Sequence, residues 1–205
     1  MKRIEIQSEG ANPDFIGGWI IDPLTICDEL IEFFEAHRQS HTQGKMAGGL
    51  NLDSKKSTDL SIRPNELDSP GHEPVRNYLQ TLFTCYRDYL EQWPFLKGFL
   101  QNSEVGPFNI QRYDPSGHFQ KIHSERTTLA TAHRVFAWMT YLNDVEDGGE
   151  THFVYQQLDV QPQKGKTLIW PAEWTHAHQG KVVNSGQKYI ITGWIHFAPP
   201  PAPAG

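Results

Sequence analysis

Seven short runs of residues between positions 108 and 197 decide the fold of this sequence. They are FNIQRY (108–113), HFQKIH (118–123), RVFAWMTYL (134–142), THFVY (151–155), LDV (158–160), TLIW (167–170) and KYIITGWIHF (188–197). The runs are rich in the β-branched and aromatic residues that strands favour. Turn residues separate them, as in Asp114-Pro115-Ser116-Gly117, Asp147-Gly148-Gly149 and Asn184-Ser185-Gly186. Short strands at this spacing favour a β sandwich or a β barrel.

Two amphipathic helices are predicted before these strands. Asp22-Pro23 predicts a helix start, with aspartate as the cap and proline at the first helical position, and the helix continues as LTICDELIEFFEAHR. A second helix is predicted from about Glu73 to Gln92, where apolar residues recur at steps of three and four. We therefore expect an α+β, mainly β fold, in which a helical brace (about residues 22–92) precedes a β core (about residues 108–197).

The polar stretch from His41 to Ser69 separates the two helices, and we predict only one short strand in it, Asp59–Ile62. A stretch this long without regular structure is either functional or a disordered surface excursion. Its residues Lys55, Lys56 and Ser57 are where substrate contacts are expected. The proline-rich residues 198–205 are expected to form a disordered tail.

The composition restricts the classes of partner. The chain has 205 residues, which fits a single domain, and 18 Lys plus Arg against 24 Asp plus Glu give a net charge of −6. An acidic protein offers no general attraction for phosphate backbones, so no nucleic-acid partner is expected. No apolar run is long enough for a membrane span and no signal peptide is apparent, which predicts a cytoplasmic protein. Cys27 and Cys85 are expected to be core residues, and the oligomeric state is not predictable here.

One candidate metal site stands out among the histidines. His123 and Glu125 are two positions apart, so on a strand both side chains would leave the same face. His178 is the candidate third ligand, with His176 as its competitor on the same face. Two histidines and one carboxylate on a β scaffold are typical of the facial triad of non-haem Fe(II) oxygenases, although zinc sites use similar ligands.

Lys188 favours an oxygenase over a zinc enzyme. It lies ten residues after His178 and opens an otherwise apolar strand, where a buried ammonium group is costly without an anion. Lys188, Ile190, Thr192 and Trp194 alternate onto one face of that strand. This face is expected to line the cavity that holds the metal.

These motifs together resemble those of the prolyl 4-hydroxylase-like 2-oxoglutarate- and Fe(II)-dependent dioxygenases. The resemblance rests on Tyr113, on His123-Ser-Glu125, on YLND (141–144) followed by GGETHF (148–153), on PQKGKTLIW (162–170), and on His178 with Lys188. It covers about residues 108–197. It implies a double-stranded β-helix, a jelly roll with the iron between two sheets, and a single dioxygenase domain over residues 1–197.

The resemblance also implies roles for individual residues. His123, Glu125 and His178 correspond to the catalytic iron ligands, and Lys188 to the residue that pairs with the distal carboxylate of 2-oxoglutarate. Tyr113 and Thr151 match positions that hydrogen-bond this carboxylate in relatives, and Trp194 is expected to form a wall of the cofactor site. Glu125 departs from the aspartate usual in the family and is longer by one bond of about 1.5 Å.

The implied reaction uses Fe(II), with 2-oxoglutarate and O2 as cosubstrates and ascorbate as a reductant. It hydroxylates an unactivated C–H bond, either of a prolyl residue in a peptide or protein or of a small molecule, and releases succinate and CO2. Two alternatives remain open from the residues: a zinc-dependent hydrolase or lyase with the same ligands, and a catalytically silent metal-binding jelly-roll module.

Overall fold

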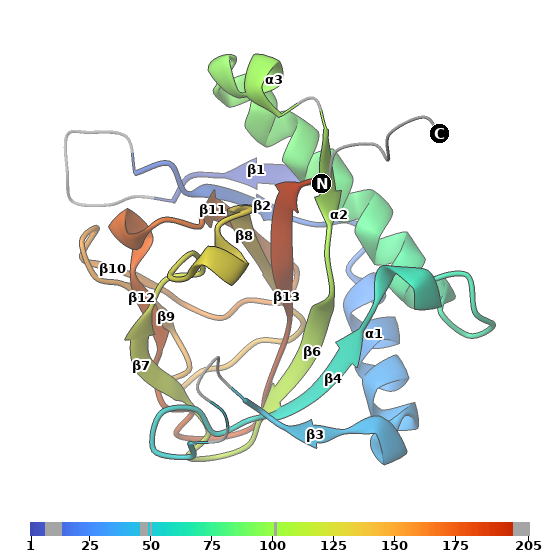
Figure 1. Cartoon of the computed structure of the whole chain (residues 1–205). Helices are drawn as coiled ribbons and strands as arrows, with labels where there is room; N and C mark the ends of the chain where they lie inside the picture. Colours follow the sequence, from blue (N-terminus) through green and yellow to red (C-terminus); the bar gives the residue numbers. More distant parts are fainter. Residues whose placement is uncertain (7–13, 46–48, 50, 101, 199–205) are drawn as a thin grey trace.

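The computed structural model describes residues 1–6, 14–45, 49, 51–100 and 102–198, and in this part of the chain two antiparallel sheets face each other (Figure 1). The larger sheet runs in the order β1 (Lys2–Ile4), β2 (Gly17–Ile20), β11 (Lys166–Pro171), β8 (Arg134–Tyr141), β13 (Lys188–Phe197), β6 (Phe108–Tyr113), β4 (Thr58–Ile62) and β3 (Thr42–Gln43), and β5 (Ser103–Val105) also pairs with β13. The smaller sheet runs in the order β10 (Leu158–Val160), β9 (Thr151–Phe153), β12 (His178–Gly180) and β7 (Phe119–His123). The arrangement confirms the predicted double-stranded β-helix.

Strand β13 shows how one sequence pattern serves two cores. Ile190 belongs to the apolar cluster between the two sheets, and Trp194 packs against that cluster. Tyr189 and Ile191 belong to a second cluster between the larger sheet and the helices. Side chains alternate across a strand, so β13 must be apolar on both faces, as its sequence is.

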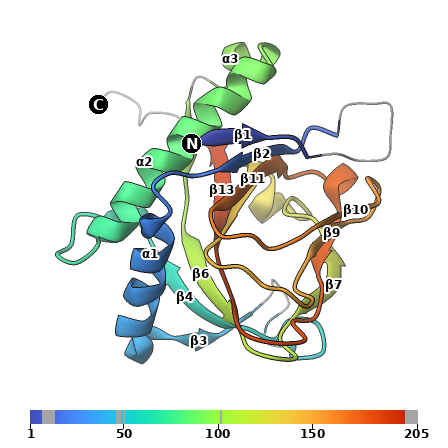
Figure 2. The same cartoon turned by 180° about the vertical axis from the view of Figure 1, so that it is seen from behind.

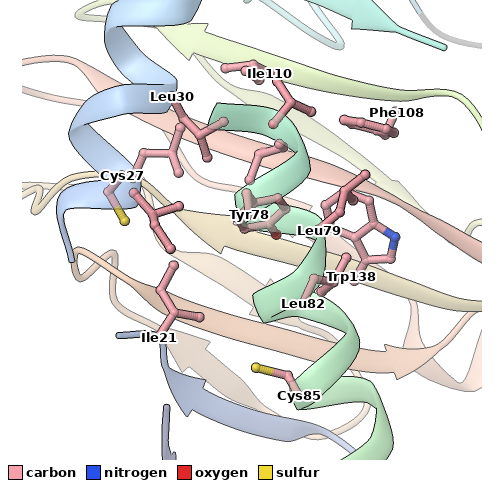
Figure 3. Close-up of a cluster of buried hydrophobic side chains, with 14 of the residues drawn as sticks. Ile21, Cys27, Leu30, Tyr78, Leu79, Leu82, Cys85, Phe108, Ile110 and Trp138 are labelled. Atoms are coloured by element: carbon pink, nitrogen blue, oxygen red, sulfur yellow. The ribbon is translucent and has the colours of Figure 1, made fainter. Parts of the chain in front are cut away.

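The helices cover the outer face of the larger sheet, away from the smaller sheet (Figures 1 and 2). This layer is formed by α1 (Thr25–Ala36) and α2 (Glu73–Gln92), and the short α3 (Phe95–Phe99) follows α2. The chain also contains the 3-10 turns η1 (Arg38–Ser40), η2 (Pro64–Glu66), η3 (Leu129–Thr131) and η4 (Trp174–His176). Figure 3 shows side chains of α1 and α2 meeting residues of the sheet such as Trp138. Cys27 and Cys85 are free, buried residues of this cluster, as predicted. None of the helices in the described part of the chain is both long and apolar enough to cross a membrane.

Two predictions about the N-terminal half are wrong. Helix α1 begins at Thr25 with Leu24 as its N-cap residue, and no side chain caps it. Asp22 lies too early to cap the helix because the preceding residue, Ile21, still donates a backbone hydrogen bond to the carbonyl of Gly165, just before β11, at 3.0 Å.

The expected order of helices first and a β core afterwards is also wrong, because strands β1 to β4 all join the larger sheet. Strand β2 contains Gly17 and Gly18, and a side chain at either position would collide with Trp19 or Ile6, at 2.4 and 2.5 Å. The close packing requires glycine at both positions, but glycine is depleted in strands, so residue propensities do not predict β2. The predicted tail falls almost entirely on residues 199–205, outside the described residues.

Candidate metal centre

The candidate ligands come from the smaller sheet. His123 ends β7 and His178 begins β12, and the two residues are directly opposite each other in the antiparallel pair. Glu125 lies just beyond β7, where its backbone N–H donates to the carbonyl of Ala172 at 3.2 Å. The expectation that His123 and Glu125 share one strand face is therefore wrong. The chain leaves the sheet after His123, and the hydrogen bond to Ala172 holds Glu125 in place.

The structure brings these three side chains together. Nε2 of His123 lies 3.6 Å from Oε1 of Glu125, and Nε2 of His178 lies 3.4 Å from the same oxygen. One ligand atom from each residue lies within 4.8 Å of the others, and the described residues contain no other such group of three. Bonds of about 2.1 Å to an octahedral metal place neighbouring ligands about 3 Å apart, so the arrangement fits three positions on one face of a metal ion.

Both imidazole rings are oriented for metal binding. Nδ1 of His123 lies 2.8 Å from the carbonyl of Lys121, and Nδ1 of His178 lies 2.9 Å from the carbonyl of His176. A carbonyl can only accept, so each Nδ1 carries the proton and each Nε2 keeps its lone pair for a metal. His176 contributes through its backbone, since its own Nε2 lies 2.7 Å from the carbonyl of Asp14. It does not compete with His178 for the site.

The electrostatics of the centre also suit a divalent cation. Burial, reinforced by the neighbouring His178, lowers the pKa of His123 to about 4. Burial raises the pKa of Glu125, but the neighbouring His178 and His123 and the N–H of Trp194 outweigh this and lower the pKa to about 2. A neutral imidazole and an ionised carboxylate are the forms in which these groups bind metals.

Trp194 and Arg134 hold the second oxygen and the backbone of Glu125. Nε1 of Trp194 donates to Oε2 of Glu125 at 2.7 Å, and the guanidinium of Arg134 lies 3.6 Å from the centre of the Trp194 ring. Arg134 also donates to the backbone carbonyl of Glu125 at 3.1 Å. Oε2 is thereby occupied and Oε1 is left facing the imidazoles. Sequence reasoning placed Trp194 in the wall of the site but missed its contact with the carboxylate.

Lys188 lies on the opposite sheet, at the start of β13, and its side chain is only 3% exposed. Its ammonium donates to the carbonyl of Gly149 at 2.9 Å and lies 4.5 Å from the centre of the Tyr113 ring. In the described part of the chain no carboxylate lies within 4.0 Å of it, and burial lowers the pKa of Lys188 to about 8. A buried cation without a counter-ion fits the binding of an external carboxylate.

The two residues expected to bind the cosubstrate carboxylate together with Lys188 each have a partner for their hydroxyl group within the protein. Tyr113 is directly opposite Lys188 in the β6–β13 pair, but its hydroxyl donates to Gln111 at 2.8 Å. Thr151 is opposite Gly180 in the β9–β12 pair, and its hydroxyl lies 2.6 Å from that of Tyr141. A Cβ atom at Gly180 would lie 3.9 Å from the Lys188 ammonium. Thr151 is therefore one strand away from the point where β12 approaches Lys188.

The polar region from His41 to Ser69 contains the predicted short strand, as β4, and one strand that was not predicted, β3. Its residues 46–48 and 50 lie outside the described residues. Lys55, Ser57 and Asp59 are buried in it, and only Lys56 of the expected contact residues is exposed. Lys55 and Asp59 are charged residues only four positions apart, and nothing in the sequence indicates that both are buried.

Comparison with known proteins agrees with this geometry. Residues 108–196 match the model of the 2OG-Fe(II) oxygenase superfamily. A prolyl 4-hydroxylase of Arabidopsis thaliana, prolyl 4-hydroxylase 2, is 26% identical over 201 residues, which cover 83% of this chain and 62% of that protein. The chain spans 46% of the length of a second relative, the probable prolyl 4-hydroxylase 9 of the same plant.

Solved structures share the fold across nearly the whole chain. The viral collagen prolyl hydroxylase of Paramecium bursaria Chlorella virus-1, solved as a 2OG complex, has a TM-score of 0.65 at 21% identity and covers 90% of this chain and 97% of its own. A Trichoplax adhaerens prolyl hydroxylase, solved with a peptide fragment of hypoxia inducible factor, has a TM-score of 0.70 at 15% identity and covers 91% and 85%. The sequence matches support a prolyl 4-hydroxylase-like 2OG-Fe(II) oxygenase, and the solved structures share its jelly-roll fold.

Proposed function

We propose that this protein is a 2-oxoglutarate- and Fe(II)-dependent hydroxylase. One observation carries the proposal: a histidine–glutamate–histidine centre at the smaller sheet faces an interior that also contains Lys188 of the larger sheet, a buried lysine with no carboxylate within 4.0 Å in the described part of the chain. When bound, iron and 2-oxoglutarate supply the oxidising chemistry, in which O2 is consumed, the 2-oxo acid is decarboxylated to succinate and CO2, and a C–H bond is hydroxylated.

The roles of the residues follow from their contacts. His123, Glu125 and His178 hold the metal on one face, and their backbone and Trp194 partners fix their orientation before the metal arrives. Lys188 binds the far carboxylate of the cosubstrate from the larger sheet. Trp170 packs edge-on and Phe153 at a tilt against the ring of His178, and both are almost completely buried, so they keep water away from this side of the centre.

The substrate class is supported by the relatives. The plant and viral relatives are prolyl hydroxylases, and the Trichoplax protein is solved with a peptide. We therefore infer a prolyl residue in a peptide or protein as the first substrate to test, ahead of a small molecule. Ascorbate as a reductant is part of the same proposal. The zinc-dependent alternative leaves the buried ammonium of Lys188 without a function.

The decisive experiment is an anaerobic titration of the apoprotein with Fe(II) and 2-oxoglutarate. Wild-type protein should develop the visible charge-transfer band of an iron-bound 2-oxo acid and, in air, should release succinate. His178→Ala should abolish the band and Lys188→Met should require far more 2-oxoglutarate to produce it. Lys181→Met is the matched control, because Lys181 is a partly exposed lysine of the same region that pairs with Asp159 at 2.7 Å. Iron binding without a band and without succinate would refute the proposal.

The substrate and the reductant are tested with the same protein. Proline-containing peptides should raise the rate of succinate release and gain one oxygen atom by mass. A preference for a free amino acid over every peptide would overturn the peptide assignment. Ascorbate should extend the number of turnovers in the absence of a peptide, and an equal number without it would remove ascorbate from the proposal.

A further inference from the structure

A network of buried polar side chains adjoins Lys188 and reaches into the His41–Ser69 region. Its members, called here the Asp59 network, are each less than 9% exposed: Lys55, Ser57, Asp59, Gln111 and Tyr113. Asp59 accepts from Lys55 at 2.8 Å, from Ser57 at 2.7 Å and from the amide nitrogen of Gln111 at 3.1 Å. The hydroxyl of Tyr113 completes the network at the amide oxygen of Gln111, 2.8 Å away.

The directions of these hydrogen bonds are fixed by chemistry. An ionised carboxylate only accepts, and only the nitrogen of a glutamine amide donates. The amide nitrogen of Gln111 must therefore face Asp59, and this turns the amide oxygen toward Tyr113. That oxygen only accepts, so Tyr113 is the donor and its single hydroxyl proton is used inside the network. Ser57 in turn uses its own proton on Asp59.

The network is also held in place from outside. Asp59 and Gln111 are opposite each other in the β4–β6 pair, and Tyr113 and Lys188 are opposite each other in the β6–β13 pair. Gly44 closes over the network, since a side chain there would come within 2.1 Å of the Ser57 hydroxyl. Little room is left for the network to rearrange. It connects the β4 segment to the ring under the Lys188 ammonium.

We propose that Lys55 and Asp59 are positioning residues that direct the Tyr113 hydroxyl proton toward Gln111 and away from the cosubstrate carboxylate. Tyr113 then offers Lys188 the face of its ring, and Lys188 is the main donor to that carboxylate. This inference rests on the proposed function. It departs from the family resemblance, which implies that the residue at position 113 hydrogen-bonds the carboxylate directly.

The first test measures 2-oxoglutarate affinity in the anaerobic Fe(II) protein. In the natural background Tyr113→Phe should change the dissociation constant by less than about twofold, because the hydroxyl proton is already engaged. In a Lys55→Met/Asp59→Asn background the Gln111 amide is free to rotate and release that proton. There Tyr113→Phe should weaken binding at least about fivefold. A loss of about tenfold in the natural background, or equal effects in both backgrounds, would overturn the proposal.

The second test uses the apoprotein without metal or cosubstrate, so it does not depend on the proposed function. Tyr113→Phe should raise the unfolding equilibrium constant about tenfold and so destabilise the protein, since it leaves the buried oxygen of Gln111 without a donor. In the Lys55→Met/Asp59→Asn background the loss should be about threefold or less. Additive effects in this cycle would show that Asp59 does not orient the amide and would refute the inference.

Two controls keep the tests decisive. Tyr86→Phe removes a buried hydroxyl that contacts Ser103 at 3.2 Å, and it should couple to neither background. Replacing both members of a buried ion pair by neutral groups is usually tolerated, but if that variant does not fold, Gln111→Met removes the same acceptor and takes its place. If the wild-type protein binds iron but does not bind 2-oxoglutarate, the proposed function is refuted. The mutant cycle in the apoprotein would still report on the network.

Discussion

Glutamate at position 125 is the residue at which this chain departs from the family pattern, and its surroundings are fitted to it. Its backbone is held by Ala172 and Arg134, and its two oxygens face the imidazoles and Trp194. Glu125→Asp would draw the carboxylate back by about 1.5 Å and away from both. We expect Fe(II) affinity to fall about tenfold or more, as measured by anaerobic competition with a chelator. Affinity equal to that of the wild type would show that the site accepts either carboxylate.

Trp194 is the second residue whose contact has a measurable consequence. Trp194→Phe keeps the ring under Arg134 but removes the N–H that binds Oε2 of Glu125, so the carboxylate is free to turn. Losses of such ligand-orienting contacts typically weaken metal binding by about 10- to 100-fold. The same titration should show a loss in this range. Thr192→Val, on the same strand, is the control because the Thr192 hydroxyl binds the carbonyl of Trp138. Equal affinities for the two variants would contradict the assigned role.

At the scale of elements, local pattern predicted the strands of the core well. The run 188–197 is β13 and the run 108–113 is β6, with the predicted boundaries, and helix α2 spans Glu73–Gln92 as predicted. Each of these elements is long enough for its apolar residues to show the repeat typical of a strand or a helix. Strands β1, β2, β3, β5 and β12 were missed because they have two to four residues and form through pairing with other parts of the chain.

Helix α1 is joined to the larger sheet by an ionic contact as well as by its apolar face. Glu35 accepts from Arg112 of β6 and from Tyr189 of β13, each at 2.9 Å. Burial raises the pKa of Glu35, but the hydrogen bonds from Tyr189, Arg112 and Arg38 together outweigh it and leave the pKa below its ordinary value of 4.5. A carboxyl group whose pKa is lower in the folded state stabilises the fold above its ordinary pKa, and this stabilisation is lost as the pH falls through the folded pKa.

Glu35→Gln should therefore destabilise the protein at pH 7 and should flatten the loss of stability below about pH 4.5. Urea unfolding of both proteins between pH 3 and pH 7 measures the effect. Glu32→Gln on the same helix is the control, since Glu32 is exposed and makes no ion pair with a residue in the described ranges. Parallel pH profiles for wild type and Glu35→Gln would show that the contact does not link the helix to the sheet.

At the scale of the whole molecule, the candidate site is assembled from both sheets. His123 and His178 are neighbours in the smaller sheet, while Lys188 and Tyr113 are neighbours in the larger one. The spacing of His123 and Glu125 and the position of Lys188 were readable from the sequence because each is a local feature. The Asp59 network and the Trp194 contact were not, because they join residues 52 and 69 positions apart and exist only once the sheets have formed.

This division of the site between two sheets predicts how ligands stabilise the fold. Fe(II) or Mn(II) alone contacts groups on the smaller sheet side, and 2-oxoglutarate added to the metal protein also engages Lys188 on the larger sheet. A ligand at about 100 times its dissociation constant stabilises the folded state by about 2.7 kcal/mol. Each addition should therefore raise Tm by about 5 to 10 °C in anaerobic thermal unfolding. Lys188→Met should keep the step caused by the metal and lose the step caused by 2-oxoglutarate, whereas Lys181→Met should keep both. Loss of both steps in Lys188→Met would mean that this lysine supports the metal centre itself, and the assignment of an anion-binding role would fail.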